Sequence, residues 1–107
     1  MKVKIIYKEK YLAGLLWRDE SGYHFEYDEA FIKNESTYPI SVNMPKSQKT
    51  YHSNILFPLF QSMLSEGYNR ELQCKALGID THDDWNLLIN TCDHDTIGAI
   101  TIKKNEE

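Results

Sequence analysis

The segment that decides the fold runs from Val3 to Tyr27 and reads VKIIYKEKYLAGLLWRDESGYHFEY. Apolar residues fall at every second position from Val3 to Tyr7, a period that is typical of a half-buried strand. A second strand is expected at Tyr11–Arg18, where both faces are apolar and should be buried. The segment Asp19–Gly22 has the composition of a hairpin turn, and Tyr23–Tyr27 alternates again. This stretch therefore predicts a three-stranded antiparallel meander.

The residues that follow the meander predict less regular structure. One helical turn is expected at Glu29–Ile32. Because prolines stand at positions 39 and 45 and favour extended backbone, Ile40–Pro45 is expected to form a short edge strand. The polar segment Lys46–Asn54 shows no apolar periodicity and is expected to be a surface loop.

From residue 56 onward the spacing of apolar residues becomes helical. Leu56–Ser65 and Asn69–Leu77 predict two short helices, and Gly78 marks the expected end of the second. The residues of this second helix that we expect to face inward are Leu72, Ala76 and Leu77.

The clearest apolar stripe in the chain predicts a third helix. Its members lie at positions i, i+3, i+4 and i+7, and they are Trp85, Leu88, Ile89 and Cys92. The preceding segment Thr81–Asp84 offers an N-cap hydroxyl and acidic residues that suit the first turn of a helix. Alternation over Ile97–Ile102 then predicts a closing strand, before a charged tail from about residue 103.

These elements together predict an α+β fold, in which a small antiparallel meander sheet with a closing strand packs against about three short helices. A chain of 107 residues has the length of one domain, so residues 1–107 are expected to form a single domain. With 41% hydrophobic residues the chain has enough apolar material to fold without metal or disulfide bonds.

Charge and the amino-terminal sequence limit the classes of partner. Twelve basic residues against 16 acidic ones give a net charge of −4, which disfavours direct binding to nucleic acid. The first residues contain no apolar run long enough for a signal peptide or a membrane span, so we expect a cytoplasmic protein without membrane contact. Cys74 and Cys92 are accordingly expected to be buried free thiols.

The most chemical-looking cluster is Cys92–Asp95, which joins a thiol, an imidazole and two carboxylates. Its spacing matches no zinc pattern, and a thiol on an apolar stripe behaves as a small hydrophobic group, so a helix end with a polar turn is favoured over a metal or nucleophilic site. Phosphate-binding glycine loops and kinase signatures are absent from the sequence. We therefore expect no catalysis and no cofactor, and a small thiol or histidine enzyme remains an alternative.

Four collinear segments resemble the HipA N-terminal subdomain: Tyr38–Pro45 (YPISVNMP), Leu56–Gly67 (LFPLFQSMLSEG), Leu77–Ile79 with Thr81–Asp84, and Ile97–Ile100 (IGAI). They match the segments P-[IL]-S-x-x-[LM]-P, P-x-F-x-x-L-L-P-E-G, L-G-I-S-x-x-D and the closing G-A strand of that family. Together with the opening meander, the resemblance covers nearly the whole chain.

In full-length HipA toxins this subdomain precedes a serine/threonine kinase, and the present chain is expected to end where that kinase would begin. The chain is thus similar to the small HipS components of three-component HipBST toxin–antitoxin systems. The resemblance implies an antitoxin-like protein that binds and inhibits a separate kinase, HipT, together with the helix-turn-helix protein HipB. The alternative is an assembly domain that links kinase and repressor without inhibition.

The expected partner-binding residues lie between the first two predicted helices, at Ser65, Glu66, Gly67, Tyr68 and Asn69. Glycine at position 67 permits a sharp exposed turn that would project the tyrosine ring toward a partner. The alternative is that this tyrosine only covers the helix pair. Trp17 and Trp85 are expected to be buried in the core instead.

Overall fold

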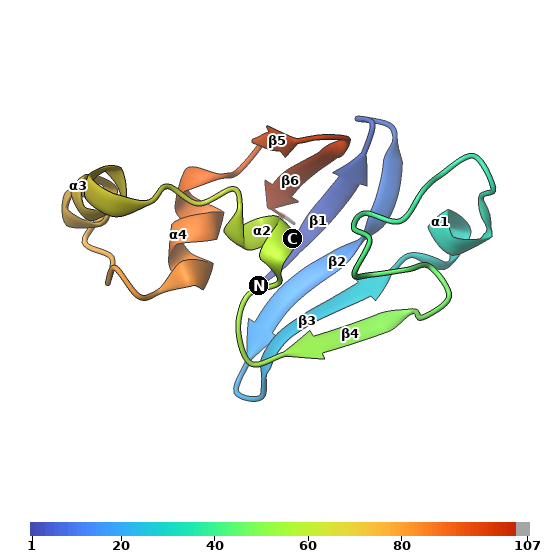
Figure 1. The fold of residues 1–107 in the computed structure, drawn as a ribbon, viewed down its shortest axis with the longest axis horizontal. Helices are drawn as coiled ribbons and strands as arrows, with labels where there is room; N and C mark the ends of the chain where they lie inside the picture. The colour runs from blue at the N-terminus through green and yellow to red at the C-terminus, as the bar shows by residue number, and fades with distance from the viewer. Residues whose placement is uncertain (105–107) are drawn as a thin grey trace.

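A computed structural model describes residues 1–104 of the chain, as one six-stranded sheet with four short helices. The strands run in the spatial order β4-β3-β2-β1-β6-β5, and neighbouring strands are antiparallel (Figure 1). The elements in chain order are β1 Lys2–Tyr7, β2 Tyr11–Asp19, β3 Gly22–Tyr27, α1 Glu29–Lys33, β4 Thr50–Ser53, α2 Pro58–Gln61, α3 Gly67–Leu77, α4 Asp84–Thr91, β5 Thr96–Ile97 and β6 Ile100–Lys104. The predicted α+β class and the antiparallel sheet are confirmed.

The predicted meander is present as β1, β2 and β3, and Asp19 pairs with Gly22 across its second turn. The burial of β2 differs from the expectation. A bulge shifts the register between Ile5 and Ile6, so that the adjacent residues Ala13 and Gly14 are both buried. The expectation that both faces of β2 are buried is wrong, because Leu15 and Trp17 on the face opposite the core are half-buried and Leu12 is 37% exposed.

The predicted edge strand at Ile40–Pro45 is wrong, because the structure has turns there and places the outer strand at β4, inside the predicted loop Lys46–Asn54. The buried Tyr27 explains the difference. Its hydroxyl donates a hydrogen bond to the carbonyl oxygen of Met44 and accepts one from the amide of Ile40 at 3.1 Å. These backbone groups thus bond to a side chain rather than to a neighbouring strand.

Replacing Tyr27 by phenylalanine is expected to destabilise the protein by about 1 to 3 kcal/mol, because the amide of Ile40 and the carbonyl of Met44 would lose a buried partner. Burial raises the pKa of this hydroxyl to about 12, so the native group stays protonated and can donate. Urea unfolding monitored by circular dichroism measures the change. A control substitution, Tyr11→Phe, removes the hydroxyl of a half-buried tyrosine outside this contact and should leave stability unchanged.

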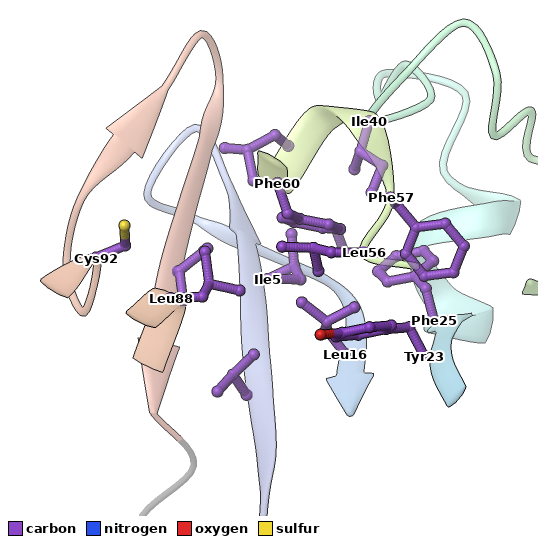
Figure 2. Packing of buried hydrophobic residues seen from close by; sticks show 14 of the residues in the cluster. Ile5, Leu16, Tyr23, Phe25, Ile40, Leu56, Phe57, Phe60, Leu88 and Cys92 are labelled. Carbon is purple, nitrogen blue, oxygen red and sulfur yellow. The ribbon is translucent and has the colours of Figure 1, made fainter. Parts of the chain in front are cut away.

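The core lies between one face of the sheet and helices α1, α2 and α4 (Figure 1). Figure 2 shows Leu56, Phe57 and Phe60 packed beside Phe25 and Ile5. Helix α2 is shorter than the predicted Leu56–Ser65, because only Pro58–Gln61 are helical and turns follow.

The predicted stripe on α4 is confirmed, since Trp85, Leu88 and Cys92 are buried and Ile89 is half-buried. The cap of this helix differs from the expected Thr81 hydroxyl. Asp83 is the N-cap, and its carboxylate accepts a hydrogen bond from the amide of Asn86 at 3.1 Å.

The predicted inward face of α3 is wrong. Leu72 is 48% exposed, Leu77 is 51% exposed, and Ala76 is exposed as well. Cys74 is the buried residue of this helix, which lies at the far end of the molecule beyond α4 (Figure 1). Only Cys74 of this helix belongs to the core cluster, and the side chains of Leu72 and Leu77 remain on the surface.

The closing strand is a hairpin rather than a single strand. Strands β5 and β6 pair at Ile97 and Ile100, and Gly98 adopts a φ of 56° between them. Lys103 and Lys104, expected to begin the charged tail, belong to β6. The remainder of that predicted tail, residues 105–107, lies outside the described residues.

Candidate functional site

The predicted binding segment, Ser65–Asn69, spans the end of a turn and the start of α3. Ser65 and Glu66 precede the helix, and Gly67 opens it with a φ of 59°. Tyr68 and Asn69 therefore lie in the first helical turn, rather than in a loop between two helices. The ring of Tyr68 is on the surface, with 72% of the residue exposed, so it does not cover the helix pair.

Tyr68 and Leu72 stand four residues apart and share one side of α3. We call these two residues the α3 apolar surface. The helix is attached to the start of α4 through Arg70, whose Nε donates to the carbonyl oxygen of Thr81 at 2.8 Å and whose guanidinium pairs with Asp84. This attachment fixes the direction in which the α3 apolar surface is presented.

The cluster Cys92–Asp95 forms a helix end with a polar turn. The amide of Asp95 donates to the carbonyl oxygen of Cys92 at 2.9 Å, and the Asp93 carboxylate accepts from the amide of Lys104 at 2.9 Å. Burial raises the pKa of the Cys92 thiol, and its sulfur lies 3.6 Å from the carbonyl oxygen of Met63. A buried thiol with a raised pKa is a poor nucleophile.

Both cysteines, Cys74 and Cys92, are buried and unbonded to each other. Within residues 1–104, no group of three or more histidine, cysteine or acidic side chains is placed to hold a metal ion. Within the same residues, no helix has the length and apolar content needed to cross a bilayer.

Sequence reasoning missed a polar cluster on the sheet face opposite the core. The imidazole Nε2 of His24 lies 2.9 Å from both Asp19 Oδ1 and Ser21 Oγ, and its ring centroid lies 4.8 Å from that of His52. Trp17, which was expected in the core, stacks on His24 at 5.3 Å and is only half-buried. The cluster depends on the pairing of β3 with β4, and the polar sequence of β4 gave no periodicity from which to predict that pairing.

The serine, histidine and aspartate of this cluster do not have the geometry of a catalytic triad. In a triad, the serine and the carboxylate bond to different ring nitrogens, so that the ring can accept a proton on one side. Here both contact the same Nε2 of His24, and Ser21 Oγ also donates to Asp19 at 2.7 Å. The arrangement closes the β2–β3 turn and does not activate the hydroxyl.

The hydrogen bonds from Ser21 and His24 hold the pKa of Asp19 at about 2, below its usual value of 3.8. Because the folded-state pKa is lowered, the carboxylate contributes stability above pH 4 that is lost as pH falls from about 4 toward 2. We expect Asp19→Asn to flatten the pH dependence of the melting temperature in this range. Melting curves at pH 2.5, 3.5 and 6 measure it, and an unchanged slope in the variant would contradict the assignment. Glu20→Gln, at an exposed neighbour outside these hydrogen bonds, is the control.

Comparison with protein families assigns most of the chain to one of them. Residues 4–103 match the model of the HipA N-terminal domain. A relative from Haemophilus influenzae, called an uncharacterized protein, is 31% identical over 94 residues, which cover 88% of this chain and 84% of that protein.

A second relative is much longer than this chain. It is the putative kinase Y4mE of Sinorhizobium fredii, 28% identical over 97 residues, and the match covers 90% of this chain but 23% of that protein. Among solved structures, an N-terminal domain of HipA toxin superposes with a TM-score of 0.69 and 23% identity, over 100% of this chain and 95% of that one. The structural match shows a shared fold.

Proposed function

This chain belongs to the HipA N-terminal domain family, and from that premise we propose that it is a non-catalytic, antitoxin-like protein that binds and inhibits a separately encoded HipA-like serine/threonine kinase. The family gives the chain a toxin–antitoxin context. One observation supports the proposal that the partner is a kinase. The matching segment makes up 23% of a relative named as a putative kinase, so in that protein the domain shares a polypeptide with a far larger remainder.

In the proposed mechanism, this domain inhibits the kinase by occupying a surface of it. The domain docks on a kinase of the HipT type and holds it in an inactive arrangement, while making and breaking no bonds. Shifting a kinase from 1% to 99% inactive requires about 5.5 kcal/mol of differential binding, which interfaces obtain from a few central side chains. Aromatic residues are the most frequent such anchors, and Tyr68 on the α3 apolar surface is the candidate.

The decisive experiment combines this chain with a purified HipA-like kinase that lacks the N-terminal segment. Radiolabelled ATP measures autophosphorylation, and size-exclusion chromatography measures complex formation. Inhibition in proportion to complex formation supports the proposal. A complex with unchanged kinase activity would instead favour an assembly role beside a HipB-like repressor, and absence of a complex would refute both.

Tyr68→Ala is expected to weaken binding to this kinase by about 2 kcal/mol, or roughly 30-fold in Kd, because it removes the proposed aromatic anchor. The melting temperature should stay the same, since the ring is exposed. Tyr38→Ala is the matched control, because Tyr38 is equally exposed, at 71%, but lies in a different segment. Equal binding by both variants would remove Ser65–Asn69 from the interface.

A further inference from the structure

In the part of the chain that the structure describes, residues 1–104, no helix packs on the face of the sheet opposite the core. The buried residues of α1, α2 and α4 all belong to the core cluster on the other face. The outward side chains of β1 and β2 are absent from that cluster, although three of them are large and apolar: Ile6, Leu15 and Trp17. These three are half-buried, and Leu12 beside them is 37% exposed. An apolar strip thus crosses this face, and within the described residues no helix covers it.

Lysines line one side of the strip. In the β1–β2 register Lys2 pairs with Trp17 and Lys4 pairs with Leu15, and in the β1–β6 register Lys4 stands opposite Lys103. All three lysines are exposed. Among residues 1–104, none of them forms an ion pair with an acidic group.

The pairing of Lys4 with Lys103 is unfavourable for the isolated fold. Like charges directly opposite each other on adjacent strands repel, as Lys4 and Lys103 do here. The third lysine, Lys2, is held by a favourable cation–π contact, with its ammonium 4.3 Å from the centre of the Trp17 ring, so only the Lys4–Lys103 pair is repulsive. A bound anionic group next to apolar side chains would relieve the repulsion and cover the strip.

We propose that this lysine face, made of Lys2, Lys4, Leu15, Trp17 and Lys103, is a second docking surface that takes an acidic, apolar-containing segment of the partner kinase. The identity of that partner rests on the proposed function. Charge complementarity selects an acidic segment, and the apolar strip requires that the segment also carry apolar side chains.

A polypeptide fits this face better than a nucleic acid. Phosphate contacts would leave Leu15 and Trp17 uncovered, because a sugar-phosphate backbone has no apolar side chains to place over them. Glu26 and Asp19 project from the same face, next to Leu15 and Trp17 in the strand register, so the acidic groups of a bound segment would lie on the β1–β6 side of the face, where the lysines stand.

The lysine face is separate from the α3 apolar surface. The lysines lie on β1 and β6 in the sheet, whereas α3 lies beyond α4 at the far end of the molecule (Figure 1). A partner that engages both surfaces would contact the domain at two places. A substitution at one surface should therefore leave the contribution of the other surface to the binding free energy unchanged.

The test is Lys4→Glu in the full chain, measured by calorimetry against the purified kinase. The new carboxylate would stand opposite Lys103 as an attractive pair, so the melting temperature should be maintained or raised. The Kd for the kinase should nevertheless increase about tenfold, and its salt dependence should weaken. Lys103→Glu creates an attractive pair with Lys4 from the other strand and should give the same result. Lys33→Glu, at an exposed lysine on α1, is the matched control and should bind as the native chain does.

The outcomes separate the two proposals. Native chain that binds the kinase, with both lysine variants binding equally well, overturns the lysine face but not the proposed function. Native chain that does not bind the kinase overturns both. A gel shift of a 30-base-pair DNA duplex by the native chain, lost in Lys4→Glu, would reassign the face to nucleic acid and overturn the acidic-segment proposal.

Discussion

Trp85→Ala is expected to lower the free energy of unfolding by about 3 to 5 kcal/mol, within the range for removal of a large buried aromatic side chain. The indole is 6% exposed and meets the ring of Tyr23 edge-on, with centroids 6.3 Å apart. It lies in the first turn of α4, two residues after the Asp83 cap. Its loss would leave a cavity between that helix and β3, which the surrounding backbone can close only in part.

Urea titration and thermal melting measure this effect. In a domain of about 100 residues, each kcal/mol lowers the melting temperature by about 4 to 8 °C, so the shift should be large. Tyr68→Ala, at an exposed aromatic residue, supplies the contrast and should melt as the native protein does. A loss of less than 1 kcal/mol in Trp85→Ala would show that α4 does not depend on this side chain.

Gly14→Ala is expected to destabilise the protein by about 3 kcal/mol or more, although it adds only a methyl group. An added Cβ would overlap the carbonyl oxygen of Glu26 and lie 2.8 Å from Cζ of Phe25. Overpacking usually costs about 1 to 3 kcal/mol, and the larger value applies here because a strand carbonyl cannot rotate away without breaking the β2–β3 ladder.

Gly67→Ala is the matched control for this substitution. An added Cβ there would meet no atom within 4 Å, so the remaining penalty is the left-handed backbone with its φ of 59°. That penalty is about 1 to 2 kcal/mol. If the two alanine variants lost equal stability, steric overlap at Gly14 would not be the reason that glycine stands in β2.

The meander β1–β3 was predictable because the alternation of apolar and polar residues in its sequence matches the burial of its side chains. Tyr23, Phe25 and Tyr27 alternate with polar residues, and this period appears directly in the structure as the buried face of β3. The α4 stripe was predictable for the same reason, since Trp85 and Leu88 repeat at the helical period. In both cases local spacing and tertiary burial agree.

The errors arose where a distant group decides the local structure. Ile40–Pro45 has strand-like composition, but the hydroxyl of Tyr27 binds its backbone. β4 is polar and is a strand only because β3 offers it a partner. Leu72 and Ala76 have helical spacing, but α3 lies beyond α4 and places only Cys74 in the core cluster.

The candidate site was predicted in part. The exposure of Tyr68 agrees with the expectation of a projecting side chain, while its binding role remains a prediction. The lysine face was not predicted, because it depends on which residues stand opposite each other across strands. Lys4 and Lys103 are 99 residues apart in the sequence, so no local sequence pattern predicts that they pair.

The weak attachment of α3 should allow this helix to open while the rest of the domain stays folded. This helix of 11 residues buries Cys74 and is held to α4 through Arg70, so little apolar surface would be exposed if it opened alone. Its amide hydrogens should exchange with solvent deuterium without global unfolding, well before those of the central strands. A partner that binds α3 would slow this exchange, and part of its binding energy would be used to hold the helix closed.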